Sequence, residues 1–253
     1  MADEKPKPFH LVGIGAHLDD CWLGFGGTAL KALRRGHRVT FIVAVTNFRK
    51  LEYLAGRDAE IMAFLGKQSK DTGVEFVYLK HDYMRLQNTP ELIDELVQIL
   101  VKLKPDIVFA HDENECNQDH VALGAATHIA VQHAGCFLPH DIQPLYLTGE
   151  IYQYTTGWQS GGFVPDTYVD VTETVFDVMN ICSSVDILYA QGKYPTKQLT
   201  ITDHTADNKS IELTGHSRFK FAQCMVFGNG HGYAEAFKSY TKIALQHRRL
   251  ARI

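Results

Sequence analysis

The sequence lacks the features that mark disulfide-rich, membrane-spanning and nucleic-acid-binding proteins. Its cysteines are odd in number and contain no CxxC pair, which argues against a disulfide framework and for a reducing compartment. They are Cys21, Cys116, Cys136, Cys182 and Cys224. No apolar run is long enough to span a bilayer. No basic stripe or arginine cluster marks a nucleic-acid surface. We therefore expect no membrane span and no nucleic-acid partner.

The chain also lacks internal repeats, low-complexity segments and a linker rich in proline and serine. Its net charge of -4 is mild, and residues 1–8 lack the apolar core of a signal peptide. With 253 residues the chain can bury a full core. We expect one cytoplasmic domain over residues 1–253, in which a tail (1–8) precedes a core (10–135) and a C-terminal elaboration (140–253).

Short apolar runs alternate with helical patterns in the first half of the chain. Strands are predicted at residues 10–16, 37–45, 75–79 and 106–110, and helices at 21–35, 57–66, 90–104 and 120–135. This alternation predicts an α/β fold, namely a Rossmann-like, mostly parallel, doubly wound sheet flanked by helices. Beyond Pro139 the pattern weakens. It predicts a C-terminal α/β elaboration with strands in 143–154 and 168–171, a helix at 175–190, a loop at 193–209 and a helix at 211–227.

Two polar clusters follow strands of this sheet. The first predicted strand ends in HLDD, which holds His17, Asp19 and Asp20, and the fourth is followed by HDENECNQDH, which ends at His120. In a doubly wound sheet these two strand ends lie side by side at the switch point, where ligands bind. We expect the two clusters to form one site.

This residue set suits a catalytic metal. Zinc accepts imidazole nitrogen and carboxylate oxygen, and a catalytic zinc site takes three protein ligands and leaves a position for water. His17, Asp20 and His120 supply that number and mixture, although iron, cobalt or manganese would accept the same set. Asp19 would then be free to take a proton from the water that attacks a carbonyl. Hydrolysis of an amide is the natural reaction.

The stretches AHLDDCWLGFGG and NQDHVALG resemble the paired signatures of the LmbE-like (PIG-L-like) family of zinc-dependent N-acetylglucosaminyl deacetylases. The first signature is Ala-His-Pro-Asp-Asp followed by a Gly-Gly pair, and the second is His-x-Asp-His. The resemblance implies zinc ligands at His17, Asp20 and His120, a general base at Asp19 and a supporting carboxylate at Asp119. It also implies an N-acetylated amino sugar or glycoconjugate as substrate.

The chain departs from the family pattern at Leu18, which replaces proline, and at Asn117, which stands where many members have the histidine that stabilises the oxyanion. The Asn117 amide can still donate a hydrogen bond to an oxyanion. Arg57 in RDAE and the segment GYAEAF also resemble family elements. We expect Asp19, Asp119 and Asn117 to be catalytic, and Arg57, His111 and His231 to bind substrate.

Some loop residues are weaker candidates. Tyr83, Trp158, Phe163 and Tyr233 lie in predicted loops where aromatic rings can stack on a sugar, although core or rim packing is the safer interpretation for each. The Gly-rich stretch TTGWQSGGFVPD, at 155–166, is a candidate lid or contact of a homo-oligomer. His81, His128, His133, His140, His204 and His216 are interpreted as packing or surface residues.

Other interpretations compete with the zinc hydrolase. The Asp19-Asp20 pair suits a magnesium pocket of a receiver domain, but such a domain is about half this length. GIGAHL lacks the third glycine of a dinucleotide loop, and an isolated Asp-His pair often caps a helix. We predict zinc-dependent removal of an N-acetyl group from an N-acetylglucosamine-type sugar. The alternatives are an amidase acting on another N-acyl substrate and a catalytically impaired metal- or glycan-binding protein.

Overall fold

The computed structural model describes residues 7–49, 51, 54–134, 149–157, 162–190, 199–203, 209–213, 215–240, 250 and 253. Its strands are β1 (His10–Gly15), β2 (Arg38–Asn47), β3 (Glu75–Asp82), β4 (Ile107–His111), β5 (Glu150–Tyr154), β6 (Thr167–Asp170), β7 (Leu199–Asp203), β8 (Lys209–Leu213) and β9 (Ala234–Ser239). Its helices are α1 (Asp20–Arg34), α2 (Asp58–Thr72), α3 (Pro90–Leu103), α4 (Gln118–His133), α6 (Val175–Ala190) and α7 (Gly215–Gly228). None of these helices has both the length and the apolar character needed to cross a bilayer.

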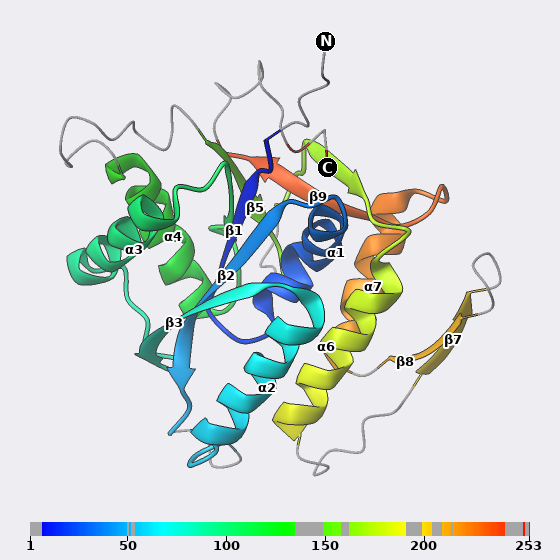
Figure 1. Cartoon of the computed structure of the whole chain (residues 1–253), viewed down its shortest axis with the longest axis horizontal. Helices are drawn as coiled ribbons and strands as arrows, with labels where there is room; N and C mark the ends of the chain where they lie inside the picture. The colour runs from blue at the N-terminus through cyan, green and yellow to red at the C-terminus, as the bar shows by residue number, and fades with distance from the viewer. Residues whose placement is uncertain are drawn as a thin grey trace.

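A seven-stranded sheet with the order β3-β2-β1-β4-β5-β9-β6 forms the centre of the molecule (Figure 1). Strands β1 to β5 pair in parallel, whereas β9 runs antiparallel to both β5 and β6. The chain moves outward from β1 to β3 and then returns to place β4 on the other side of β1. The two neighbours of β1 therefore define the switch point, and the predicted fold class is confirmed.

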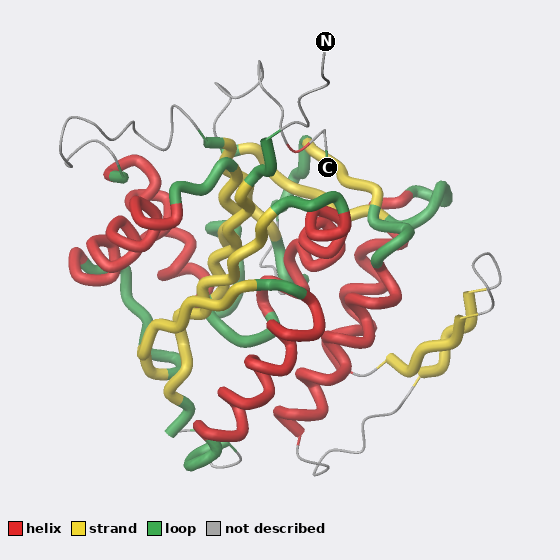
Figure 2. Tube along the Cα trace, in the orientation of Figure 1, coloured by secondary structure: helices red, strands yellow, loops and turns green. Residues whose placement is uncertain are grey.

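Helices cover both faces of this sheet (Figures 1 and 2). On one face α1 packs against α6, which also contacts α7, and on the other face α3 packs against α4. Successive residues of β1 point to opposite faces, so Leu11 joins the first core and Val12 the second. Both faces of the central strands are therefore buried, as their apolar runs require.

Helix α1 is kinked at Phe25, whose φ of -144° is not helical. The Phe25 ring stacks on Phe109 of β4, with 4.3 Å between ring centroids. It also lies against β1 at Gly13, where an added Cβ would be 2.2 Å from the ring. Gly13 is thus required by this close approach, and the ring fixes the start of α1 against the sheet.

A buried ion pair supports the peptide groups around this kink. The Glu235 carboxylate of β9 accepts hydrogen bonds from the backbone N–H groups of Gly27 and Thr28, each at 2.8 Å. Lys220 of α7 lies 2.7 Å from the same carboxylate and donates to the Gly24 carbonyl at 3.3 Å. Both charged side chains are at most 2 % exposed. The C-terminal elements therefore stabilise the helix that follows the first polar cluster.

Two sequence predictions in the C-terminal half are wrong. The predicted loop at 193–209 contains β7, and the first residues of the predicted helix at 211–227 belong to β8, which pairs antiparallel with β7. The alternation of apolar and polar residues in LTITD and KSIEL was the available signal. Residues 143–148 of the predicted strand region lie outside the described residues, as do Trp158, His140 and His204.

The buried pair predicts an asymmetric response to mutation. Glu235→Gln leaves the Lys220 ammonium buried without a counter-charge, so we expect a loss of about 3–5 kcal/mol in the free energy of unfolding. Lys67→Gln, which removes the exposed Lys67–Asp71 pair of α2, is the matched control and should cost less than about 1 kcal/mol. Urea denaturation of both variants measures the difference. Equal losses would contradict the structural role of Glu235.

Candidate metal centre

The two polar clusters meet at the switch point. His17 lies in the turn after β1, Asp20 begins α1, and His120 lies in the first turn of α4. His17 Nδ1 is 3.0 Å from His120 Nε2. Asp20 Oδ2 lies 3.4 Å from His17 Nδ1, and Asp20 Oδ1 lies 3.2 Å from His120 Nε2. One ligand atom from each residue lies within 4.8 Å of the others. Side chains from distant parts of the sequence thus form one compact donor set.

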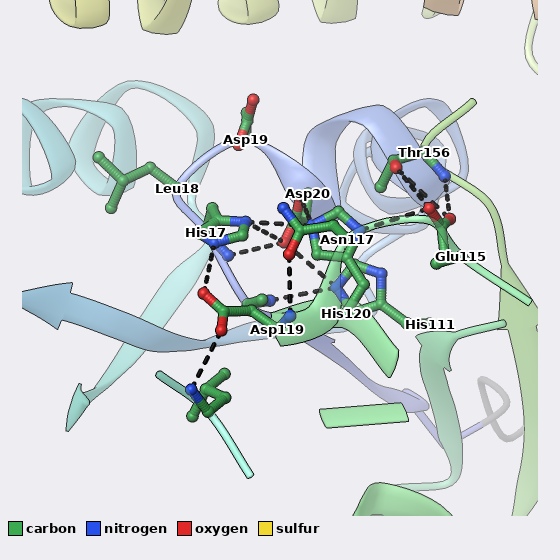
Figure 3. A network of polar contacts seen from close by, with 12 residues as sticks. His17, Leu18, Asp19, Asp20, His111, Glu115, Asn117, Asp119, His120 and Thr156 are labelled. Carbon is green, nitrogen blue, oxygen red and sulfur yellow. Dashed lines mark hydrogen bonds and ion pairs between the residues drawn. The ribbon is translucent and has the colours of Figure 1, made fainter. Parts of the chain in front are cut away.

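Neighbouring carboxylates fix how the two imidazoles are turned (Figure 3). His17 Nε2 lies 3.2 Å from Asp119 Oδ2, and His120 Nδ1 lies 3.4 Å from Glu115 Oε2. Because a carboxylate accepts hydrogen bonds, this network assigns the proton of each neutral ring to the nitrogen that faces its carboxylate. The lone pairs of His17 Nδ1 and His120 Nε2 then point toward each other and toward Asp20. Metal-bound histidines have this arrangement.

Three electron donors this close together require a positive charge between them. Burial lowers the pKa of His17, but the Asp20 carboxylate and the hydrogen bond with Asp119 outweigh it and raise this pKa to about 9. The same balance, with Asp20 and Glu115, raises the pKa of His120 to about 10. The surrounding histidines in turn hold the pKa of Asp20 well below its usual range, against the effect of burial. The cluster therefore attracts a proton or a metal ion, and its donors fit zinc.

A second donor group, His111 with Glu115 and His120, is also close enough to hold an ion. The His111 and His120 rings are stacked, with centroids 4.1 Å apart and planes only 18° from parallel. Lone pairs lie in the ring plane, so stacked rings cannot both aim at one ion. His111 instead accepts from the Ala16 N–H at 3.1 Å and contacts Asp20 Oδ2 at 3.1 Å. This geometry favours the first group.

A cavity of about 420 Å³ opens directly on the first group and is lined by His17, Asp20 and His120 together with Asp19, Asn117 and His216. Tyr83, Tyr189 and Phe48 supply part of an apolar wall. The volume is at the lower end of the range of about 300–1,000 Å³ for small-molecule sites. A ligand in this cavity can reach the open side of the donor set, as a catalytic metal site requires.

Asp19 takes a different position from its neighbour Asp20. Its carboxylate stands apart from the cluster in Figure 3 and lines the cavity. One oxygen lies 3.5 Å from the Tyr189 hydroxyl, and the other lies 3.4 Å from His216 Nδ1. Burial and the charge of Asp20 raise the pKa of Asp19, which makes the carboxylate a better proton acceptor than an exposed aspartate.

Asp119 and Asn117 organise the second cluster. Asn117 is the N-cap of α4, and its side-chain oxygen accepts from the Asp119 N–H at 2.8 Å. Its amide NH₂ is then its remaining donor at the cavity wall. Asp119 is fully buried and accepts from the Met84 and Leu86 N–H groups at 2.6 and 3.0 Å. These bonds hold the loop that carries Tyr83 against His17, with 5.2 Å between ring centroids.

None of the three residues expected to bind substrate lines the cavity. His111 is buried behind Asp20, and His231 is exposed in the turn between α7 and β9, so neither lines the cavity. Arg57 donates to the Leu188 carbonyl at 2.9 Å and to Glu60. It thereby holds the end of α6, next to Tyr189, and acts on the cavity wall from outside. Short motifs place these residues near the site but do not show which way a side chain points.

Two residues of the site were missed by the sequence interpretation. Glu115 was part of the second cluster but had no assigned role, and its position within a loop gave no sign that it meets His120. His216 was interpreted as a packing or surface residue because it is alone in a weak pattern. It reaches the cavity only through the packing of α7 on α6, which no local sequence signal reveals.

The contact between Glu115 and His120 predicts an effect on metal affinity. Glu115→Gln replaces the carboxylate that orients His120 by a neutral amide, whose oxygen is a weaker acceptor, so we expect zinc affinity to fall about 10–100-fold. Glu113→Gln is the matched control, since this carboxylate also contacts a histidine, His128 at 3.1 Å, but on the outer surface of α4. Titration against a competing chelator measures both. Unchanged affinity in Glu115→Gln would contradict the assigned orientation of His120.

Solved structures share this fold at low sequence identity. The conserved protein TT1542 from Thermus thermophilus matches with a TM-score of 0.70 and 20% identity, over 92% of this chain and 95% of that chain. The N,N'-diacetylchitobiose deacetylase from Pyrococcus horikoshii matches with a TM-score of 0.67 and 21% identity, over 93% of this chain and 85% of that chain. The 4-carboxy-2-hydroxymuconate hydratase from Pseudomonas putida KT2440 matches with a TM-score of 0.64 and 13% identity, over 92% of this chain and 96% of that chain. These similarities establish the fold, which serves more than one reaction.

A family model matches the sequence of the N-terminal half of the chain. Residues 12–131 match the family model of GlcNAc-PI de-N-acetylase, PIG-L. This match covers β1 through most of α4, and therefore both polar clusters and the proposed ligands. Membership supports N-deacetylation, a hydrolytic reaction, as the class of chemistry. Residues 12–131 form a PIG-L (LmbE-like) domain.

Proposed function

We propose that this protein is a zinc-dependent N-deacetylase that removes the acetyl group from an N-acetylglucosamine-type sugar or conjugate. The observation that carries the proposal is the convergence of the His17, Asp20 and His120 donors at a cavity whose wall holds the Asp19 carboxylate. Family membership supports the deacetylase class. The proposal goes beyond this class by naming zinc as the metal and an N-acetylglucosamine-type sugar as the substrate.

His17, Asp20 and His120 would hold the metal ion. When bound, zinc lowers the pKa of a water molecule and polarises a carbonyl oxygen. Asp119 and Glu115 keep the imidazole lone pairs turned inward. Oriented donors at the wall of a cavity support this assignment.

Asp19 would serve as the general base. Its raised pKa and its place at the cavity wall suit a carboxylate that takes the proton of the attacking water. Tyr189 and His216 contact its two oxygens and hold the carboxylate in place. The Asn117 amide would donate a hydrogen bond to the oxyanion that forms on the acetyl carbonyl.

The substrate assignment rests on the family and on the cavity. The family description names a GlcNAc derivative, and one structural neighbour deacetylates diacetylchitobiose. Tyr83, Tyr189 and Phe48 give the cavity aromatic surface of the kind on which a sugar face can pack. A polar floor beside an apolar wall suits an acetamido group attached to a pyranose ring.

Asn117 gives a specific reason to consider a weaker enzyme. It replaces a histidine of the family signature, and its oxygen is engaged as a helix cap. A protein that binds an acetylated sugar without turnover, or an amidase with another N-acyl substrate, would use the same donors. Acetate release from a panel of N-acetylated sugars separates these possibilities, because only the proposed deacetylase releases acetate in proportion to bound metal.

The general-base assignment predicts a separation of metal binding from activity. Asp19→Asn keeps the shape of the side chain but removes its basicity, so we expect kcat for acetate release to fall about 10²–10⁴-fold. Zinc content should stay at the wild-type value because Asp19 is outside the donor set. Asp82→Asn, at the end of β3, is the control and should leave both unchanged. Full activity in Asp19→Asn would show that another group is the base.

A further inference from the structure

His216 lies on a part of the cavity wall that comes from the C-terminal half of the chain. It is the second residue of α7 and lines the cavity with His17 and His120. The latter two imidazoles belong to the donor set. Among the cavity-lining residues that the structure describes, His216 is therefore the imidazole left for proton transfer.

The side chain of His216 is held by a carboxylate from α6. Asp186 Oδ1 lies 2.7 Å from His216 Nδ1, and Asp186 Oδ2 accepts the His216 backbone N–H at 3.0 Å. Two bonds to one carboxylate fix both the start of α7 and the ring. The same nitrogen lies 3.4 Å from Asp19 Oδ2, so Asp186 holds the ring beside the carboxylate of the proposed base. A carboxylate at Nδ1 is the arrangement that orients a catalytic histidine in other hydrolytic sites.

Three carboxylates act on the charge of His216. Asp186 approaches from α6, while Asp19 and Asp20 approach from the start of α1. The hydrogen bond to Asp186 and the charges of these carboxylates raise the pKa of His216 to about 9. The ring is about one third exposed, so solvent reduces the strength of this effect. His216 is nevertheless a proton donor at neutral pH.

We propose that His216, positioned by Asp186, is the general acid that protonates the leaving amine of the substrate. The proposal rests on the proposed deacetylase function and adds a catalytic residue from outside the segment that matches the family model, residues 12–131. His216 supplies from α7 an imidazolium that the second signature lacks, since Asn117 stands at its histidine position.

Every proton in the proposed hydrolysis step is accounted for. Water adds its oxygen to the acetyl carbon and gives one proton to Asp19. The C–N bond breaks as the His216 imidazolium passes a proton to the amine nitrogen, which leaves acetic acid, the free amine, neutral His216 and protonated Asp19. Asp19 Oδ2 lies 3.4 Å from His216 Nδ1, so the proton of Asp19 can return to His216 after the products leave. The protein is then restored without another reactant.

Two variants test this role by activity. His216→Gln should lower kcat about 10²–10⁴-fold with little change in KM, whereas zinc content should remain at the wild-type value. Asp186→Asn keeps the imidazole but weakens its hold on the proton, so the basic limb of the kcat profile should move to lower pH. A merely structural Asp186 would lower kcat without moving that limb. His81→Gln is the matched control, since His81 pairs with Glu95 at 2.8 Å and is equally exposed.

Histidine NMR provides a readout that does not depend on turnover. The imidazole signal that His216→Gln removes should titrate well above the ordinary histidine value of about 6.5 in the wild-type protein and near that value in Asp186→Asn. A signal that titrates near the ordinary value in both proteins would overturn the proposal, as would wild-type kcat in His216→Gln. If the wild-type protein releases no acetate from any sugar, the proposed function fails, and the NMR titration still decides whether Asp186 holds His216 as a cation.

Discussion

The site depends on the mutual repulsion of buried electron donors. His17 Nδ1, His120 Nε2 and the Asp20 carboxylate lie within 3.0–3.4 Å of one another in a region almost closed to water. Without a positive charge between them this arrangement would be unfavourable, since burial strengthens the repulsion. The protein maintains it by giving each imidazole a carboxylate at its other nitrogen. A positive charge at the switch point, carried by a proton or a metal ion, therefore stabilises this arrangement.

The C-terminal elements complete a site whose signature residues lie in the first half of the chain. Glu235 and Lys220 support the kinked α1 that begins with Asp20. Tyr189 and His216 contact the Asp19 carboxylate from α6 and α7. The match to the family model ends at residue 131, yet Tyr189 and His216, which contact the proposed base, come from beyond it. Differences in this second half can change reactivity while the metal ligands stay the same.

The parallel core and the donor set were predictable because their signals are local. Apolar runs and helical periods define β1 to β4, and the switch-point rule brings His17 and His120 together once the strand order is known. Strands β7 and β8 were missed because their apolar–polar alternation extends over only five residues each, within a polar region. His216 and Glu115 were missed because their roles arise from packing between distant elements. Arg57 was placed near substrate by motif resemblance and His231 by its position in a glycine-rich turn, and neither signal shows the direction of a side chain.

The central claim is that one metal ion binds between His17, Asp20 and His120. Anomalous diffraction from a crystal of the zinc-loaded protein, recorded at the zinc edge, tests it most directly. We expect one strong peak within about 2.0–2.2 Å of His17 Nδ1, His120 Nε2 and an Asp20 oxygen. A peak between His111, Glu115 and His120, or no peak at the switch point in zinc-loaded protein, would contradict the account.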